Sequence, residues 1–171
     1  RCSSIISPDH LEKLSVVIIT FNEEEHIATC LDSVAEIADE ILVLDSFSSD
    51  QTKTLCLNAG VRFEEHAFDG YIAQKNRALR MAKYDLVLSL DGDEAISEEA
   101  RVLIAEIKER RKADAYAFPR RNNYCGKWMR FTSQYPDRKV RLVDRNKALW
   151  SGYDPHDYLQ MQPNSSLISL K

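Results

Sequence analysis

Hydrophobic residues follow two different spacings along the first two-thirds of this chain. The run 14–20 is apolar and rich in β-branched residues, which predicts a buried strand, and the shorter runs 40–44, 61–66 and 86–90 predict three more strands. Between and after these runs, apolar residues recur every three or four positions, which predicts helices starting at Asn22, over 51–59, over 74–82 and from Ser97 onward. Alternating strands and helices predict an α/β fold, a mostly parallel central sheet with helices on both faces.

Residues at the predicted helix ends support these boundaries. Asn22 offers a capping oxygen, and the glutamates that follow it favour a helix start. Ser97 is placed to cap the last and longest helix, whose apolar positions are Val102, Leu103, Ile104 and Ile107. Gly60 supplies the left-handed residue that ends the second helix.

The pattern changes after residue 114. Short strand candidates occupy 115–118, 140–143, 148–150 and 167–170, and the stretch 119–136 is basic and aromatic without a clear period. Neither a repeat nor a linker separates this part from the first. We expect one domain over 1–171 in which the second part decorates the first.

Composition narrows the class of protein. The 23 Lys and Arg against 27 Asp and Glu give a formal charge of −4, whereas a nucleic-acid binder normally carries a basic excess. The longest uncharged apolar stretch, 14–22, is too short for a membrane helix, and the N-terminus lacks a signal-peptide pattern. The four cysteines form no C-x-x-C pair, and Cys30 and Cys56 lie among apolar helix positions. We therefore expect reduced, buried cysteines and a cytoplasmic protein.

Polar clusters follow three of the predicted strands. They comprise residues 20–23, residues 45–46 and residues 91–94. In parallel α/β sheets ligands bind outside the carboxyl ends of the strands, so these clusters are expected to share one rim.

Asp91-Gly92-Asp93 is the sharpest of these clusters. Two carboxylates one residue apart can hold Mg²⁺ or Mn²⁺ together with phosphate oxygens, and Gly92 leaves room for a ligand. The alternative is an ordinary turn, since Asp and Gly are common in turns. The position at a strand end beside two other polar clusters favours the metal site.

The other strand-end residues suit a nucleoside. The Asp45 carboxylate can accept from a base or a ribose, and the alternative is a helix cap or an Asx turn with the next serines. Thr20, Phe21, Asn22 and Glu23 can form a cradle with Phe21 as its apolar wall. For Asn22 and Glu23, simple helix capping is the alternative. Lys75 opens a predicted helix, where the dipole disfavours cations, which suits a bound diphosphate unless it is a solvated surface residue.

The second part supplies candidates for contact with another substrate. Trp128 and Tyr135 can stack on sugar rings, while Arg130, Arg138 and Arg141 can meet anionic groups. Nucleic-acid contact, a membrane-surface patch, and core packing for Trp128 are the alternatives. His156-Asp157 is a polar pair expected in a loop, where the carboxylate can act as a general base and the imidazole as a metal ligand or phosphate contact, unless the histidine is structural.

Several of these segments resemble the family-two glycosyltransferases of the GT-A fold. The resemblance rests on LSVVIITFNE at 14–23, DSFSSD at 45–50 and DGDE at 91–94. More narrowly, Lys75-Asn76, 124–126, 135–137, Arg141-Leu142 and His156-Asp157 resemble a bacterial subgroup of lipopolysaccharide core glucosyltransferases. The resemblance extends from about residue 14 to residue 157.

The resemblance implies a role for each matching residue. The nucleotide-sugar donor would be bound by Thr20, Phe21, Asn22, Glu23, Asp45, Ser46, Lys75, Asp91 and Gly92 in the part 14–114. Asp93, with Asp91, would ligate the metal. The acceptor side, 115–171, would include Trp128, Tyr135, Asp137, Arg138 and Arg141. Asp157, assisted by His156, would be the base, although the subgroup usually has His-Glu there and an aspartate reaches one methylene less.

The same resemblance implies an inverting transfer of a sugar, glucose by first choice, from a UDP-sugar to a glycan or lipopolysaccharide-type acceptor. A lipid-linked acceptor would place the enzyme at the inner face of the cytoplasmic membrane, and the subgroup tends to continue beyond the point where this chain stops. One alternative is a nucleotidyltransferase, which would need a glycine-rich loop that 20–25 lacks, and a dinucleotide oxidoreductase fails because no G-x-G-x-x-G is present. Another is a catalytically inactive module that binds sugar nucleotides or glycans.

Overall fold

The computed structural model describes residues 11–119, 123–124, 127–128 and 138–170. The predictions for Cys2, Cys125, Arg130, Tyr135 and Asp137, and for the side chain of Trp128, therefore lie outside the described residues. No helix in the described part is long and apolar enough to cross a membrane.

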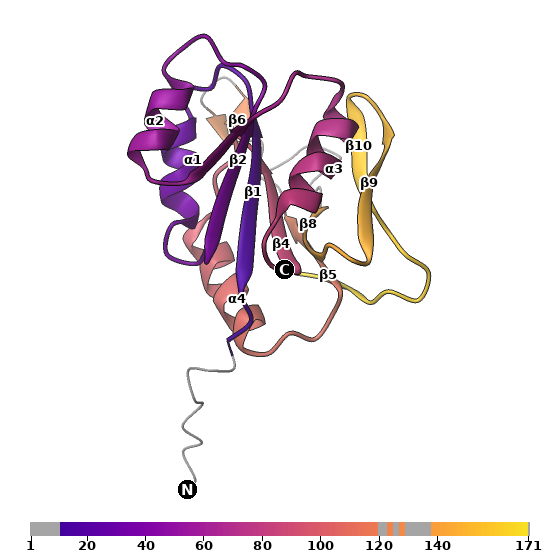
Figure 1. Ribbon diagram of the computed structural model, residues 1–171. Coiled ribbons are helices and arrows are strands. Elements are labelled where there is room, and N and C mark those ends of the chain that lie inside the picture. The colour runs from indigo at the N-terminus through magenta and orange to yellow at the C-terminus, as the bar shows by residue number, and fades with distance from the viewer. Residues whose placement is uncertain (1–10, 120–122, 125–126, 129–137, 171) are drawn as a thin grey trace, which may run out of the picture.

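A seven-stranded sheet organises the molecule (Figure 1). Its order is β11 (Leu167–Ser169), β5 (Ala115–Pro119), β8 (Arg138–Asp144), β4 (Leu86–Asp91), β1 (Leu14–Thr20), β2 (Glu40–Asp45) and β3 (Arg62–Glu65). Within the described strands of this sheet, β8 alone runs antiparallel to its neighbours, β4 and β5. The expected mostly parallel α/β sheet is confirmed.

Helices cover both faces of the sheet, as predicted. On one face α1 (Ile27–Val34), α2 (Thr52–Asn58) and α4 (Glu98–Glu109) pack against alternate strand residues such as Val16 and Ile18. On the other face, α3 (Tyr71–Met81) and the hairpin of β9 (Ala148–Tyr153) and β10 (His156–Met161) cover Val17 and Ile19. Helix α3 and the hairpin lie side by side (Figure 1). A further short hairpin pairs β6 (Asn123–Tyr124) with β7 (Lys127–Trp128).

The predicted helix ends are right in some places and wrong in others. Ser97 caps α4 by accepting from the amide of Ala100, and Gly60 has a φ of +71° after α2. The first helix, however, begins at Ile27, and Asn22 has a φ of +52° instead of capping it. The amides of residues 22–24 donate to side chains of the segment 48–52, so a loop-to-loop contact replaces the first helical turn.

Two other predicted positions are also corrected. Helix α3 begins at Tyr71, three residues before the expected start, which puts Lys75 in the second turn. His156 and Asp157 belong to strand β10 and pair with Tyr153 and Gly152 of β9, so they are not in a loop. In helix α4, Ile104 and Ile107 are buried as expected, but Val102 is exposed.

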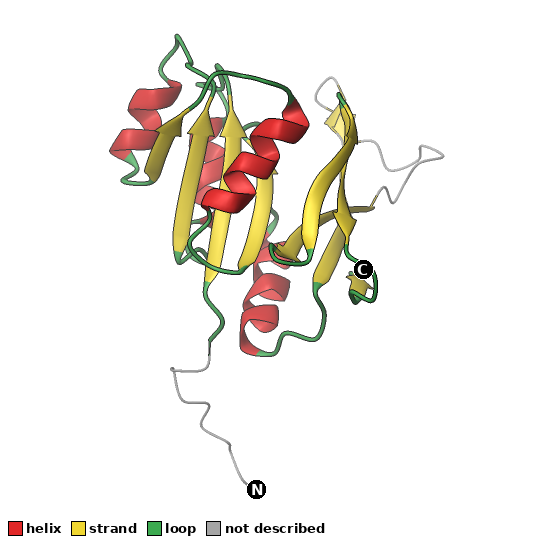
Figure 2. Cartoon of the chain, turned by 45° about the vertical axis from the view of Figure 1, so that its right-hand side comes forward, coloured by secondary structure: helices red, strands yellow, loops and turns green. Residues whose placement is uncertain are grey.

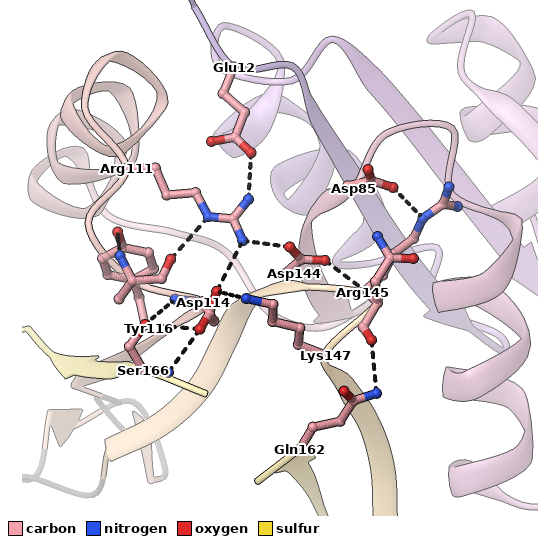
Figure 3. A network of polar contacts seen from close by, with 12 residues as sticks. Glu12, Asp85, Arg111, Asp114, Tyr116, Asp144, Arg145, Lys147, Gln162 and Ser166 are labelled. Atoms are coloured by element: carbon pink, nitrogen blue, oxygen red, sulfur yellow. Dashed lines mark hydrogen bonds and ion pairs between the residues drawn. The ribbon is translucent and has the colours of Figure 1, made fainter. Parts of the chain in front are cut away.

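An ion-pair network joins the first and second parts of the chain (Figure 3). The Arg111 guanidinium donates to Glu12, before β1, at 2.5 Å and to Asp144, at the end of β8, at 2.9 Å. Lys147 donates to Asp114 at 2.7 Å, and Asp114 also accepts from the amide and hydroxyl of Ser166. These contacts fix β5, β8 and β11 at their end of the sheet.

Cys30 and Cys56 are buried and free, as expected. Burial raises the pKa of the Cys30 thiol to about 12 and that of Cys56 to about 11. Such thiols stay protonated at neutral pH and act as small apolar side chains.

Candidate active site

The carboxyl ends of the three central parallel strands meet at one edge of the sheet. In the register, Thr20 pairs with Asp45 across β1 and β2, and Ile19 pairs with Asp91 across β1 and β4. The arrowheads of the central strands point to this edge in Figure 2. The amide of Gly92 donates to the Ile19 carbonyl at 2.9 Å, which brings the 91–94 turn against the end of β1. The polar clusters predicted to share a rim do so.

Asp45 is engaged locally. Its side chain is fully buried, and its two carboxylate oxygens accept from the amide of Ser48 at 2.6 Å and from the Ser48 hydroxyl at 2.5 Å. Asp45 is thus held by a serine of the segment that follows it, which is the local role that the sequence offers as the alternative to nucleoside binding, although the amide it accepts from is three residues on and the contact is therefore not an Asx turn. Contact with a base or ribose stays a prediction. It would require either that the Asp45 oxygens accept a further hydrogen bond beside those from Ser48, or that Ser48 moves away.

The loop after β1 is ordered by the loop after β2. The backbone N–H of Asn22 donates to Ser48 Oγ at 2.8 Å, and the side-chain Oδ1 of Asn22 accepts from the backbone N–H of Ser49. The amide of Glu23 donates to Thr52 Oγ1, and Phe21 projects into solvent with 56% of its surface exposed. The exposed ring of Phe21 is the apolar surface that a stacked base would need.

Gly92 is required by a neighbouring side chain. A Cβ at this position would lie 2.7 Å from Thr20 Oγ1 and 3.2 Å from Glu23 Cγ. Thr20 Oγ1 is itself buried and has no hydrogen-bond partner among the described residues. The room left by Gly92 is therefore occupied by Thr20, and a polar hydroxyl without a partner stands at this edge.

Lys75 connects the donor-side cluster with the second part of the chain. Its ammonium lies 3.0 Å from Asp91 Oδ1 and 2.8 Å from Asp157 Oδ2, and its side chain is only 5% exposed. Arg141, from β8, lies 3.6 Å from Asp91 and 2.5 Å from Glu94. Positive and negative groups therefore alternate from Glu94 to Asp157, and Lys75 and Arg141 each have two carboxylates beside them.

Trp150 forms the floor beneath these charges. Its backbone N–H donates to Asn76 Oδ1 and its carbonyl accepts from Asn76 Nδ2, both at 2.8 Å. The Lys75 ammonium lies 4.5 Å from the centre of the indole, and the Arg141 guanidinium carbon lies 5.7 Å from it, so both cations face its ring. The indole Nε1 is buried without a partner among the described residues.

A pocket of about 720 Å³ opens beside this cluster. Of the predicted site residues, it is lined by Lys75, Asp91, Arg138, Arg141, His156 and Asp157. The remaining described candidates lie outside its lining, along the rim of the sheet: Thr20, Phe21, Asn22, Glu23, Asp45, Ser46, Gly92 and Asp93. His156 lines the pocket and is exposed, and the centre of its ring lies 5.1 Å from that of Tyr153 with the two rings tilted by 60°.

The two aspartates of the predicted metal site differ in their surroundings. Asp91 is held by Lys75 and Arg141, whereas Asp93 is exposed and makes no hydrogen bond or ion pair with the described residues. Among the described residues, no three or more His, Cys, Asp or Glu side chains come together in a way that could hold a metal ion by themselves. A hard cation that takes one protein carboxylate and fills its shell with water and phosphate oxygens fits Asp93.

Sequence reasoning assigned no role to Trp150, Asn76 or Asp154. Asp154 accepts hydrogen bonds from the amides of Tyr71 and Ile72 at 3.0 and 3.2 Å and so caps α3 from the β9–β10 turn. Nothing in the local pattern around Asp154 points to a helix 82 residues away. The sequence around Trp150 and Asn76 gives only a weak indication of their roles, because a tryptophan and an asparagine at these positions would also suit ordinary packing and helix-surface contacts.

Comparison with known proteins agrees with this geometry. The family model "Glycosyl transferase family 2" matches residues 15–166. An uncharacterized glycosyltransferase of Rickettsia typhi is 37% identical over 62% of this chain, and a lipopolysaccharide core biosynthesis glycosyltransferase, LpsC of Rhizobium meliloti, is 34% identical over 55% of it. The chain spans 36% of the length of each of these curated relatives.

Solved structures show the same fold. The S. aureus TarS 1–349 structure in complex with UDP-GlcNAc superposes with a TM-score of 0.62 at 18% identity, covering 93% of this chain and 59% of TarS 1–349. Glucosyl-3-phosphoglycerate synthase from Mycobacterium tuberculosis in complex with UDP gives 0.55 at 24% identity, covering 65% of this chain and 45% of that one.

The mostly parallel sheet, together with its likeness to these solved glycosyltransferase structures, makes this a GT-A type α/β protein. The chain belongs to glycosyl transferase family 2.

Proposed function

We propose that this chain is the catalytic part of an inverting glycosyltransferase that moves a hexose, glucose by first choice, from a UDP-sugar to a glycan or lipopolysaccharide-type acceptor. One observation carries the proposal: Asp91, on the donor side, and Asp157, on the acceptor side, line one pocket and are joined through Lys75. A single displacement needs a donor and a base on opposite sides of one reaction centre.

The donor would lie along the rim of the sheet, within the part 14–114. The exposed ring of Phe21 offers a stacking surface, and the unpartnered Thr20 hydroxyl offers a hydrogen bond. Asp93 is the residue available to hold Mg²⁺ or Mn²⁺, a cation that would neutralise charge on the departing nucleoside diphosphate. Neighbouring proteins of this fold have been solved with UDP, and glucosyl-3-phosphoglycerate synthase also with Mn²⁺, which supports this choice of donor and cation.

The acceptor would enter from the second part of the chain, 115–171. Asp157 has one carboxylate oxygen paired with Lys75, and its other oxygen has no partner among the described residues. That second oxygen would take the proton of the acceptor hydroxyl. The hydroxyl oxygen would at the same time attack the anomeric carbon from the face opposite the leaving nucleoside diphosphate. Arg138 and the ring of His156 stand at the same pocket and would orient the acceptor. The similarity to LpsC supports a saccharide of the lipopolysaccharide core, and such a lipid-linked acceptor would bring a cytoplasmic enzyme to the membrane surface.

A panel of nucleotide sugars tests the proposal. A matching UDP-sugar with Mn²⁺ should raise the melting temperature, because a ligand bound only by the native state stabilises it. The same UDP-sugar should then release UDP when a core oligosaccharide is supplied. Stabilisation by nucleoside triphosphates and by no UDP-sugar would contradict the proposal.

An inactive sugar-nucleotide-binding module is the second candidate, because Lys75 already occupies one oxygen of the only carboxylate assigned as base. Tight UDP-sugar binding without UDP release, in the full-length protein with acceptor present, would favour that candidate.

A further inference from the structure

Lys75 is committed to protein groups before any substrate arrives. Two carboxylates lie within 3.0 Å of its ammonium, and the indole of Trp150 lies beneath it at 4.5 Å. Its side chain is 5% exposed, so the ammonium has little access to solvent. A diphosphate contact, which the resemblance implies for this residue, would have to replace one of these carboxylates.

The contact with Asp157 determines how that carboxylate is presented. Asp157 is itself 11% exposed, and Lys75 is the one cation that the structure records within ion-pair distance of it in the described part of the chain. The pairing uses Oδ2 and leaves Oδ1 for another donor. Lys75 in turn is fixed by α3, whose next residue, Asn76, is hydrogen-bonded to the backbone of Trp150 at both of its amide atoms.

We propose that Lys75 is a positioning residue for the base Asp157: it holds one carboxylate oxygen against the α3–β9 contact and aims the other into the pocket. The assignment rests on the proposed function, because it gives Asp157 the role of base. Lys75 therefore acts on turnover through Asp157, and its contribution to donor affinity is small.

Substitution of Lys75 separates turnover from binding. Lys75→Met keeps the unbranched apolar stem of the side chain, one atom shorter, and removes its charge. We expect kcat for UDP release from the best UDP-sugar to fall about tenfold or more, while the donor KM and the calorimetric Kd for UDP with Mn²⁺ change less than about threefold. Lys53→Met is the matched control, because Lys53 also forms an ion pair, with Glu65 on the surface, but lies outside the pocket.

A double-mutant cycle and chemical rescue guard against a purely structural effect. In an Asp157→Asn background, Lys75→Met should cost less than about threefold further in kcat, since the group it positions is already gone. Lys75→Ala should regain kcat when ethylammonium or propylammonium is added, and the melting temperature should not follow that recovery. If Lys75→Met folds poorly, the rescue of Lys75→Ala still tests the assignment.

Other outcomes would overturn the assignment. If Lys75→Met raises the Kd for UDP about tenfold with kcat little changed, Lys75 is a diphosphate ligand. Equal further loss in the Asp157→Asn background would show that Lys75 does not act through Asp157. If the wild-type protein binds UDP but releases no UDP from any UDP-sugar with acceptor present, the proposed function is wrong, and so is the role of Asp157 as a base. If the wild-type enzyme does turn over, the proposed function stands, and a contrary result with the Lys75 variants contradicts only the role assigned to Lys75.

Discussion

The carboxylate of Asp154 caps helix α3 at Tyr71, across 83 residues of sequence. The two oxygens accept from the first two amides of the helix, and glycine is favoured at position 70 because its φ is +112° and a Cβ would lie 2.7 Å from Asp154 Oδ2. Asp154 stands in the turn between β9 and β10, two residues before His156. The cap therefore sets the position of the strand that carries Asp157 relative to the helix that carries Lys75.

Removing this cap should destabilise the protein and weaken the site. Asp154→Ala leaves two helical amides without their partner, so we expect the free energy of unfolding to fall by about 1 kcal/mol in urea denaturation. Asp154→Asn, which keeps an acceptor oxygen, is the control and should lose less. An Ala variant as stable as the wild type would show that the cap is not a stabilising contact.

Asp93 should be needed for metal-dependent binding. Asp93→Ala removes an exposed carboxylate with no partner among the described residues, so the fold should be unaffected. The affinity for UDP measured by calorimetry with Mn²⁺ should fall by about tenfold or more. Asp32→Ala, on the exposed side of α1, is the matched control. Unchanged UDP affinity in the Asp93 variant would refute the metal assignment.

Asp157 should affect turnover far more than donor affinity. Asp157→Asn keeps the shape of the side chain but removes the proton acceptor, so kcat should fall by about 10²–10⁴-fold. The Kd for UDP with Mn²⁺, measured in parallel, should stay close to that of the wild type. Equal losses in kcat and donor affinity, with the structure preserved, would make Asp157 a binding residue.

The close approach of Gly92 to Thr20 predicts a local steric effect. Gly92→Ala places a Cβ 2.7 Å from Thr20 Oγ1, so we expect a loss of about 1–3 kcal/mol in unfolding free energy. In a Thr20→Ala background the same change should cost less, because the nearest atom is absent. Gly60→Ala is the control: it meets no atom within 4 Å and carries only the penalty of its φ of +71°, about 1 kcal/mol. Identical costs of Gly92→Ala in both backgrounds would contradict the steric explanation.

The network around Asp114 predicts a specific acid response. Hydrogen bonds from Lys147 and from Ser166 lower the pKa of Asp114 to about 2, against about 3.9 for an unfolded chain. A depressed carboxyl pKa stabilises the folded state above the unfolded value, and this contribution is lost as the pH falls from about 4 towards 2.

Thermal unfolding at a series of pH values would measure this effect. Asp114→Asn should flatten the decline in melting temperature between about pH 4 and 2, while lowering stability at neutral pH. Asp32→Asn serves as the exposed control. A variant that declines as steeply as the wild type would show that Asp114 does not contribute to the acid response.

The sequence alone determined the elements and the edge at which they present polar groups. Strand and helix spacing is a local property, so the runs at 14–20 and 86–90 predicted β1 and β4 closely. Parallel strands share a carboxyl edge, and the convergence of Thr20, Asp45 and Asp91 followed from that geometry. The family resemblance was readable for the same reason, because its motifs are continuous segments at strand ends.

Only the tertiary structure decided which partner each of these side chains has. Asp45 turned to Ser48, Thr20 filled the space beside Gly92, and Lys75 joined Asp91 to a carboxylate 82 residues further along the chain. Such pairings depend on how the β9–β10 hairpin packs on α3 and how two loops meet. The energy of a contact between distant residues depends on the packing of everything between them, and no local pattern of hydrophobic and polar positions encodes it.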